Sequence, residues 1–128
     1  MSDAKPSVYY IVELGGYPLF LDELAKRNIE VLVERKMRKA ISHLKSARPS
    51  VIVAEFNHQS QFRDRVSNLE SLLACRQGHC PESRFITMLA VEDMPYFEKV
   101  QDQYPIDKAL IYPLNETVLL DTILELTQ

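Results

Sequence analysis

Residues 51–57, VIVAEFN, decide the fold, because they form a nearly continuous apolar run that ends in one carboxylate, Glu55. Such a run is typical of a strand that is buried on both faces of a parallel sheet. The runs SVYYIVEL at 7–14 and RFITMLAV at 84–91 have the same character. We therefore predict a sheet whose inner strands are covered by helices on both sides.

The segments between these runs alternate between helical and strand patterns. Apolar residues at helical spacing predict helices over 18–28, 35–49, 67–77, 94–105 and 115–128. Two shorter strands are expected over 29–34 and 109–113. Ser67 and Glu70 form a capping-box pattern, and Asn115 is the expected N-cap of the last helix. This alternation predicts the α/β class: a flavodoxin-like, doubly wound (βα)5 domain with a five-stranded parallel sheet.

The bulk composition limits the kind of protein. A length of 128 residues predicts a single domain, 1–128, with a short polar tail at 1–6. The net charge of −3 gives no overall field that would recruit nucleic acid or an anionic membrane. No apolar run approaches the roughly 20 residues of a membrane span. We therefore expect a cytoplasmic protein with neither a membrane nor a nucleic-acid partner.

Ligands and reactive groups of such sheets lie at the carboxyl ends of the strands. Four stretches contain those ends: YYIVELGG (9–16), SVIVAEFN (50–57), FITMLAVED (85–93) and ALIYPLNETVLLDTI (109–123). Their order and spacing resemble the receiver domain of bacterial response regulators, and the likeness spans residues 7–126. The resemblance implies two-component signal transduction, a phosphorelay and a phosphorylation pocket at the strand ends.

This chain departs from the receiver pattern at the metal and at the phospho-acceptor. The first of the two metal-binding acids maps to Glu13, but the second maps to Leu14, which supplies no oxygen. The accepting aspartate maps to Glu55, whose extra methylene displaces the attacking oxygen. Mg²⁺ requires several oxygen ligands, so Glu13 and Glu55 alone make a weak magnesium site. We expect no cofactor.

The positions that would sense phosphorylation are also altered. The Thr or Ser of the fourth strand maps to Ala90, and the lysine maps to Tyr112, although its proline is retained as Pro113. The aromatic residue of the fifth strand maps to Ala109. Because neither a cation nor a hydroxyl relay is present, we predict a degenerate pocket that aspartyl phosphorylation does not activate.

These departures predict a stand-alone pseudo-receiver, not an enzyme, that acts by binding a signalling protein or a second copy of itself. Two alternatives stay open. One is a functional phosphorelay regulator in which Glu13, Glu55 or Asp93 supports residual chemistry, and the other is a binder of a small ligand or cofactor at the strand ends. Glu55 could mimic a phosphorylated state, but we favour an ordinary acid that is solvated or paired with Arg63 or Lys108.

Two surfaces are candidates for a protein partner. One is an apolar patch around the expected helix 94–105, formed by Tyr96, Phe97, Val100, Tyr104 and Tyr112. The other is a basic face in a stretch that contains no acid, formed by Arg35, Lys36, Arg38, Lys39, Lys45 and Arg48. A solvated helix face is the simpler interpretation of the basic residues.

The remaining motifs give weak signals. CRQGHC (75–80), with His58, is a poor match to a structural zinc site, which needs four ligands at tight spacing. We expect Cys75 to pack in the core and Cys80 to be an exposed thiol. Two cysteines do not make a disulfide framework. Gly15 and Gly16 predict a tight turn after the first strand rather than a phosphate-binding loop.

Overall fold

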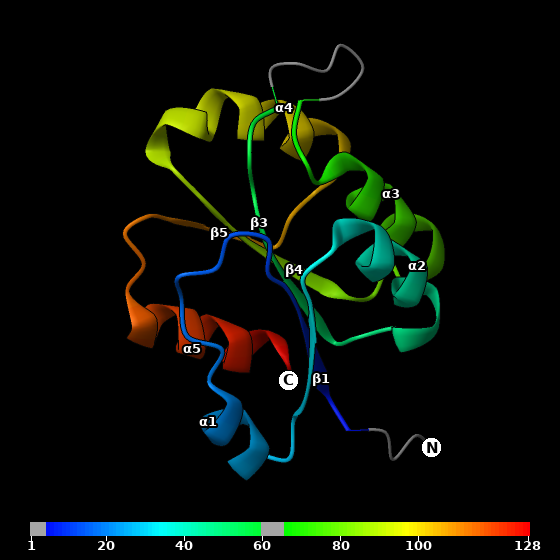
Figure 1. The fold of residues 1–128 in the computed structure, drawn as a ribbon, viewed down its shortest axis with the longest axis vertical. Helices are drawn as coiled ribbons and strands as arrows, with labels where there is room; N and C mark the ends of the chain where they lie inside the picture. Colours follow the sequence, from blue (N-terminus) through cyan, green and yellow to red (C-terminus); the bar gives the residue numbers. More distant parts are fainter. Residues whose placement is uncertain (1–4, 60–65) are drawn as a thin grey trace.

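The computed structural model describes residues 5–59 and 66–128, which contain one sheet of five parallel strands in the order β2-β1-β3-β4-β5. Inner strands with apolar side chains on both faces require a helix layer on each side, and this is the arrangement observed (Figure 1). The predicted fold class is therefore confirmed. The strands are β1 (Ser7–Ile11), β2 (Glu30–Glu34), β3 (Val51–Glu55), β4 (Arg84–Leu89) and β5 (Lys108–Ile111).

Five α-helices connect and cover the strands. They are α1 (Leu21–Lys26), α2 (Met37–Ala47), α3 (Glu70–His79), α4 (Met94–Gln103) and α5 (Glu116–Leu126). Helices α1 and α5 lie on one face of the sheet, and α2, α3 and α4 lie on the other (Figure 1). Asn115 caps α5 as predicted, because its side-chain oxygen accepts the N–H of Val118 at 3.1 Å.

Alternation along the strands creates two cores, because successive side chains point to opposite faces. Tyr9 and Ile52 pack toward α2, α3 and α4, whereas Tyr10 and Val53 pack toward α1 and α5. All four side chains are almost completely buried. Burial of one large apolar side chain stabilises a fold by about 1.5–3 kcal/mol, so both layers hold the strand ends firmly in place.

Helix α3 begins three residues later than predicted. Glu70 reaches back as expected, and its Oε1 accepts the backbone N–H of Ser67 at 2.7 Å. The Ser67 hydroxyl, however, accepts the N–H of Leu69 at 3.1 Å, so the chain turns locally before the helix starts at Glu70. Only half of the capping box is therefore formed.

The expectation that Cys80 is an exposed thiol is wrong. The last turn of α3 closes with a hydrogen bond of 2.9 Å from the N–H of Cys80 to the carbonyl of Arg76. This turn carries Cys80 into the core beneath α2, α3 and α4, where it is fully buried. Cys75 is half-buried against the same core, as predicted, and its Sγ–H donates to the carbonyl of Ile41 at 3.5 Å.

In the part of the chain that the structure describes, no helix is both long enough and apolar enough to cross a lipid bilayer.

Candidate functional site at the carboxyl edge of the sheet

The carboxyl ends of the parallel strands meet at one edge of the sheet. Glu55, the last residue of β3, is paired with Met88, and Leu89 is paired with Ile111. Because β3 lies between β1 and β4, Glu55 occupies the middle of this edge. The loops that follow β1 and β5 lie close to it, as expected at the carboxyl edge of a parallel sheet.

The carboxylate of Glu55 is buried and held by donors from the β1–α1 loop. Its Oε1 accepts the N–H of Leu14 at 2.8 Å, and its Oε2 accepts the N–H of Gly15 at 3.0 Å and the hydroxyl of Tyr17 at 2.9 Å. Only 1% of the residue is exposed. Hydrogen bonds to a charged acceptor are the stronger kind, so Glu55 fixes the position of this loop.

The conformation of two glycines brings the donors into place. Gly15 and Gly16 have φ angles of 80° and 90°, in the left-handed region that favours glycine. The chain therefore turns sharply after β1, and two successive backbone N–H groups face the same carboxylate, as in an anion-binding nest. The predicted tight turn at the Gly-Gly pair is confirmed. The group that its N–H donors bind is the side chain of Glu55.

The expectation that Glu55 is solvated or paired with Lys108 is wrong. Lys108 begins β5, so it lies at the opposite, amino edge of the sheet. Arg63 lies outside the described residues. Among the described residues, backbone N–H groups and a tyrosine hydroxyl are the partners of the carboxylate, because the β1–α1 loop folds over the strand end.

Tyr17 and Tyr112 both respond to the buried charge. Burial, and then the nearby carboxylate of Glu55, raises the pKa of Tyr17 and also the pKa of Tyr112. Both phenols therefore stay protonated at neutral pH, and Tyr17 remains a donor to Glu55. Tyr112 is 39% exposed at the end of β5, and its N–H donates to the carbonyl of Leu89 at 3.0 Å.

Asn68 connects the carboxylate of Glu13 and the backbone of Glu55 with the start of α3. Its Nδ2 amide donates to the side chain of Glu13 and, at 2.8 Å, to the backbone carbonyl of Glu55, while its Oδ1 accepts the N–H of Asn57 at 2.8 Å. Burial raises the pKa of Glu13, the hydrogen bond from Asn68 opposes that rise, and the charge of Glu55 adds to it. Asn68 thereby holds Glu13 near Glu55.

Sequence reasoning missed Tyr17 and Asn68. Tyr17 had one usable signal, its place directly after the Gly-Gly turn. Asn68 had none, because its role depends on how the β3–α3 loop returns to the end of β3. Four of the predicted pocket residues are brought together: Glu13, Leu14, Glu55 and Tyr112. Ala90 is the first residue after β4, and Pro113 is the next residue after Tyr112.

These residues do not fit a magnesium ion. Both oxygens of Glu55 already accept protein hydrogen bonds, and its burial leaves a hydrated cation no access. Leu14 offers no oxygen, and its side chain is 79% exposed to solvent. Within residues 5–59 and 66–128, no group of three or more His, Cys, Asp or Glu side chains is placed to hold a metal.

The predicted apolar patch around α4 is largely absorbed by the core. Phe97 and Val100 are buried, because the apolar stripe of α4 faces the sheet, so their assignment to an interface is wrong. Tyr96 is half-buried and stacked on His58, with ring centroids 3.6 Å apart and planes 7° from parallel. Tyr104 also packs half-buried against the core. Tyr112 is the exposed member of the set.

The basic face is exposed as predicted. All six bases, Arg35, Lys36, Arg38, Lys39, Lys45 and Arg48, have exposed side chains. The carboxylate of Glu34 accepts the first two backbone N–H groups of the stretch, at 2.8 and 2.9 Å. Arg48 pairs with Glu82 at 3.4 Å, where both side chains are largely exposed, so this pair adds little stability.

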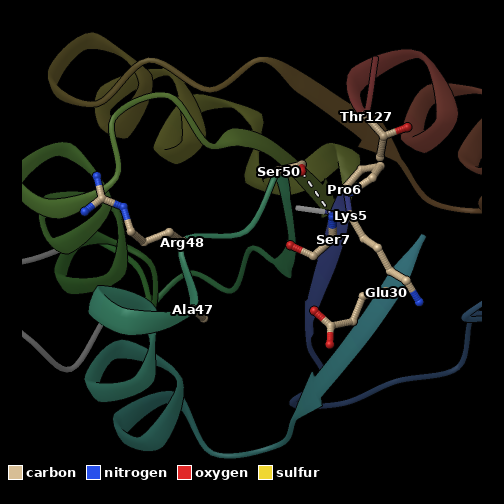
Figure 2. Close-up of a pocket in the computed structure, with 8 residues that line it drawn as sticks. All are labelled: Lys5, Pro6, Ser7, Glu30, Ala47, Arg48, Ser50 and Thr127. Carbon is tan, nitrogen blue, oxygen red and sulfur yellow. Dashed lines mark hydrogen bonds between the residues drawn. The ribbon is translucent and has the colours of Figure 1, made fainter. Parts of the chain in front are cut away.

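A recess of about 730 Å³ lies at the opposite, amino edge of the sheet, between the starts of β1, β2 and β3. Figure 2 shows the hydrogen bond from the N–H of Ser7 to the hydroxyl of Ser50, 3.0 Å long, within it. The guanidinium of Arg48 points away from the other residues drawn (Figure 2). Of the residues that line the recess, Arg48 is the one that the sequence analysis singled out.

Comparison with known proteins shows the fold. No protein-family model matches the chain, and no curated protein matches it. A LuxR-family DNA-binding response regulator from Staphylococcus aureus superimposes with a TM-score of 0.70 at 17% identity, over 96% of this chain and 99% of that one. The chemotaxis response regulator CheY4 of Vibrio cholerae gives a TM-score of 0.69 at 18% identity, with the same shares of both chains. A response regulator from Thermotoga maritima gives 0.69 at 14% identity, over 97% and 98% of the two chains. The resemblance is confirmed at the level of the fold, which is that of response-regulator receiver domains.

Proposed function

We propose that this chain, which has the receiver-domain fold, is a receiver-type signalling domain that acts by binding another protein and is not activated by aspartyl phosphorylation. The observation that carries the proposal is the state of Glu55. The residue at the acceptor position is buried, and both of its oxygens accept hydrogen bonds from Leu14, Gly15 and Tyr17.

Phosphoryl transfer needs groups that the described residues at this edge of the sheet do not supply. A carboxylate oxygen must attack phosphorus in line while Mg²⁺ and a cation neutralise the developing charge. For Glu55 to attack phosphorus, its hydrogen bonds would have to break. A hydrogen bond to a charged acceptor contributes about 1.5–3 kcal/mol to stability. Leu14 and Tyr112 stand where the resemblance expects an acid and a lysine, so neither the metal nor the charge compensation is provided.

The readout of phosphorylation is missing for a similar reason. Ala90 has no hydroxyl with which to follow a phosphoryl group, and Ala109 has no ring to reorient. A domain that neither carries out the chemistry nor relays it must act through contact with a partner. We therefore propose a non-catalytic, protein-binding role, and the conformation in which Glu55 holds the β1–α1 loop is the form the partner meets.

Amide spectroscopy tests this proposal. The ¹⁵N-labelled protein is titrated with Mg²⁺ and BeF₃⁻, and separately incubated with Mg²⁺ and acetyl phosphate before intact-mass analysis. We expect the Leu14 and Gly15 resonances to stay in place and no phosphorylated species to form. The variant Leu14→Asp/Glu55→Asp/Tyr112→Lys restores an acid pair and a cation on the same backbone, and it serves as the matched comparison.

A Mg²⁺-dependent shift at Leu14 and Gly15, or an acyl-phosphate on the wild-type chain, would overturn the proposal and favour the phosphorelay alternative. The cofactor alternative predicts a coloured protein or a small molecule that co-purifies with it. The absorption spectrum and native mass of the purified chain decide that question directly.

A further inference from the structure

A cleft separates the β1–α1 loop from the β5–α5 loop, beside the Glu55 site. Its volume is about 300 Å³. The first loop contributes Gly16, Tyr17 and Pro18, and the second contributes Tyr112, Pro113, Leu114 and Glu116. The two loops emerge from the same edge of the sheet, above the face that α1 and α5 cover (Figure 1). The cleft thus has a wall from each of two loops whose strands are not neighbours in the sheet.

The lining combines aromatic rings with negative charge. Tyr17 and Tyr112 provide two rings, and Glu116 provides a carboxylate. Behind Tyr17 lies the buried carboxylate of Glu55, 2.9 Å from the tyrosine oxygen. None of the seven lining residues is a base. Burial is the main cause of the raised pKa of each phenol, and the charge of Glu55 is the second cause. The negative field of Glu55 therefore reaches both rings.

Rings, a carboxylate and the absence of a base together select a cation. A positive group over the face of a tyrosine ring is attracted by the ring quadrupole. Guanidinium suits such a site better than ammonium, because it is planar, stacks on rings and can form two parallel hydrogen bonds to a carboxylate. A volume near the lower end of the range for ligand pockets suits one long side chain rather than a large cofactor.

We propose that the cleft between the β1–α1 and β5–α5 loops binds an arginine side chain that a partner protein presents. The guanidinium contacts the rings of Tyr17 and Tyr112 and pairs with Glu116. This inference rests on the proposed function in one respect, that the arginine belongs to a protein. The residues that would contact the guanidinium do not include Glu55.

The test uses a small arginine probe. N-acetyl-L-arginine methylamide is titrated into the ¹⁵N-labelled chain without Mg²⁺ or a phosphodonor, and the corresponding citrulline compound serves as the neutral isostere. We expect saturating shifts at the amides of Gly16 and Leu114 with the arginine probe and none with the citrulline probe. Tyr112→Leu should weaken binding by about twofold to fivefold, the range for a cation–ring contact at an exposed site, whereas Tyr112→Phe should retain it.

Glu116→Gln should also weaken binding, and Glu125→Gln, the same change elsewhere on the exposed surface of α5, should leave it unchanged. Tyr112 and Glu116 are exposed, so these variants fold, as a far-UV spectrum will verify. Equal binding of the citrulline probe, shifts confined to other residues, or full affinity in Glu116→Gln would each overturn the inference. None of these outcomes bears on the BeF₃⁻ titration, so the two proposals fail separately.

Discussion

Replacing Glu55 by glutamine tests whether this carboxylate anchors the β1–α1 loop. Glutamine has nearly the same size, but one of its terminal groups is an NH₂ that donates. In the protein both terminal atoms of Glu55 accept, one from the N–H of Leu14 and the other from the N–H of Gly15 and the hydroxyl of Tyr17. Whichever way the new amide is turned, its NH₂ faces a backbone N–H, and neither group can accept.

The size of the effect follows from burial. An N–H that points at the buried end of Glu55 and loses its acceptor costs about 1–3 kcal/mol, and water has little access to that end because Glu55 is 1% exposed. The Tyr17 hydroxyl can rotate and accept, so it adds little. We therefore expect the free energy of unfolding to fall by about 1–3 kcal/mol. At a urea m-value of about 1.5 kcal/mol/M, the midpoint falls by about 0.7–2 M.

Urea unfolding followed by far-UV circular dichroism measures this difference. Glu125→Gln makes the same chemical change at an exposed position of α5 and should stay within about 0.5 kcal/mol of wild type. If Glu55→Gln unfolds at the same urea concentration as wild type, with an unchanged slope, the carboxylate does not hold the loop. The reasoning that removes Glu55 from phosphoryl chemistry would then fail with it.

Three further predictions concern Tyr17, Glu13 and Cys80. Tyr17→Phe removes one hydrogen bond to the charged Glu55 and should lower the free energy of unfolding by about 1.5–3 kcal/mol. No change in the urea midpoint would contradict this. The pKa of Glu13 is raised in the fold. The stability that Glu13 contributes is therefore complete below the usual glutamate pKa of 4.5 and is lost as pH rises through the pKa in the folded state. Wild type should lose stability relative to Glu13→Gln over this pH range, and a difference in unfolding free energy that does not change with pH would refute the prediction. Burial also raises the pKa of the Cys80 thiol, so a thiol reagent should label Cys80 only in the unfolded chain. Peptide mapping measures this labelling, and rapid labelling of Cys80 in the native protein would contradict the prediction.

The fold was predictable because three apolar runs are long enough to be strands and too apolar to face solvent on either side. The ends of the strands were less predictable. The run from Ser7 continues to Leu14 in sequence, but the ladder of β1 stops at Ile11, because Gly15 and Gly16 turn the chain toward Glu55. The hydrophobic pattern alone therefore does not show where β1 ends.

The candidate site was predictable in position but not in state. A carboxylate at the end of a buried strand is visible in the sequence, so Glu55 was placed correctly at the carboxyl edge. Its partners are backbone N–H groups and a hydroxyl, and any residue supplies a backbone N–H. Their direction depends on the loop conformation, which spacing does not encode, so the carboxylate was expected to meet water or a base.

The sequence also did not show whether the apolar face of α4 would be exposed or buried. Phe97 and Val100 are three residues apart and share one face of α4, which periodicity reveals. Whether that face meets the sheet or a partner depends on how the helix is docked. In this protein Phe97 packs edge-on against Phe56, with ring centroids 5.7 Å apart, so the apolar face is part of the domain.

The attachment of the β1–α1 loop to Glu55 has a consequence for when this domain is ready to work. The donors and the acceptor all belong to one chain, so folding alone brings the loop to this shape. Under the proposed function, no later chemical event is needed. A complex that recognises this shape would obey mass action alone. Its occupancy would then track how much of the domain and of its partner the cell makes, and cells would tune the response through synthesis and degradation.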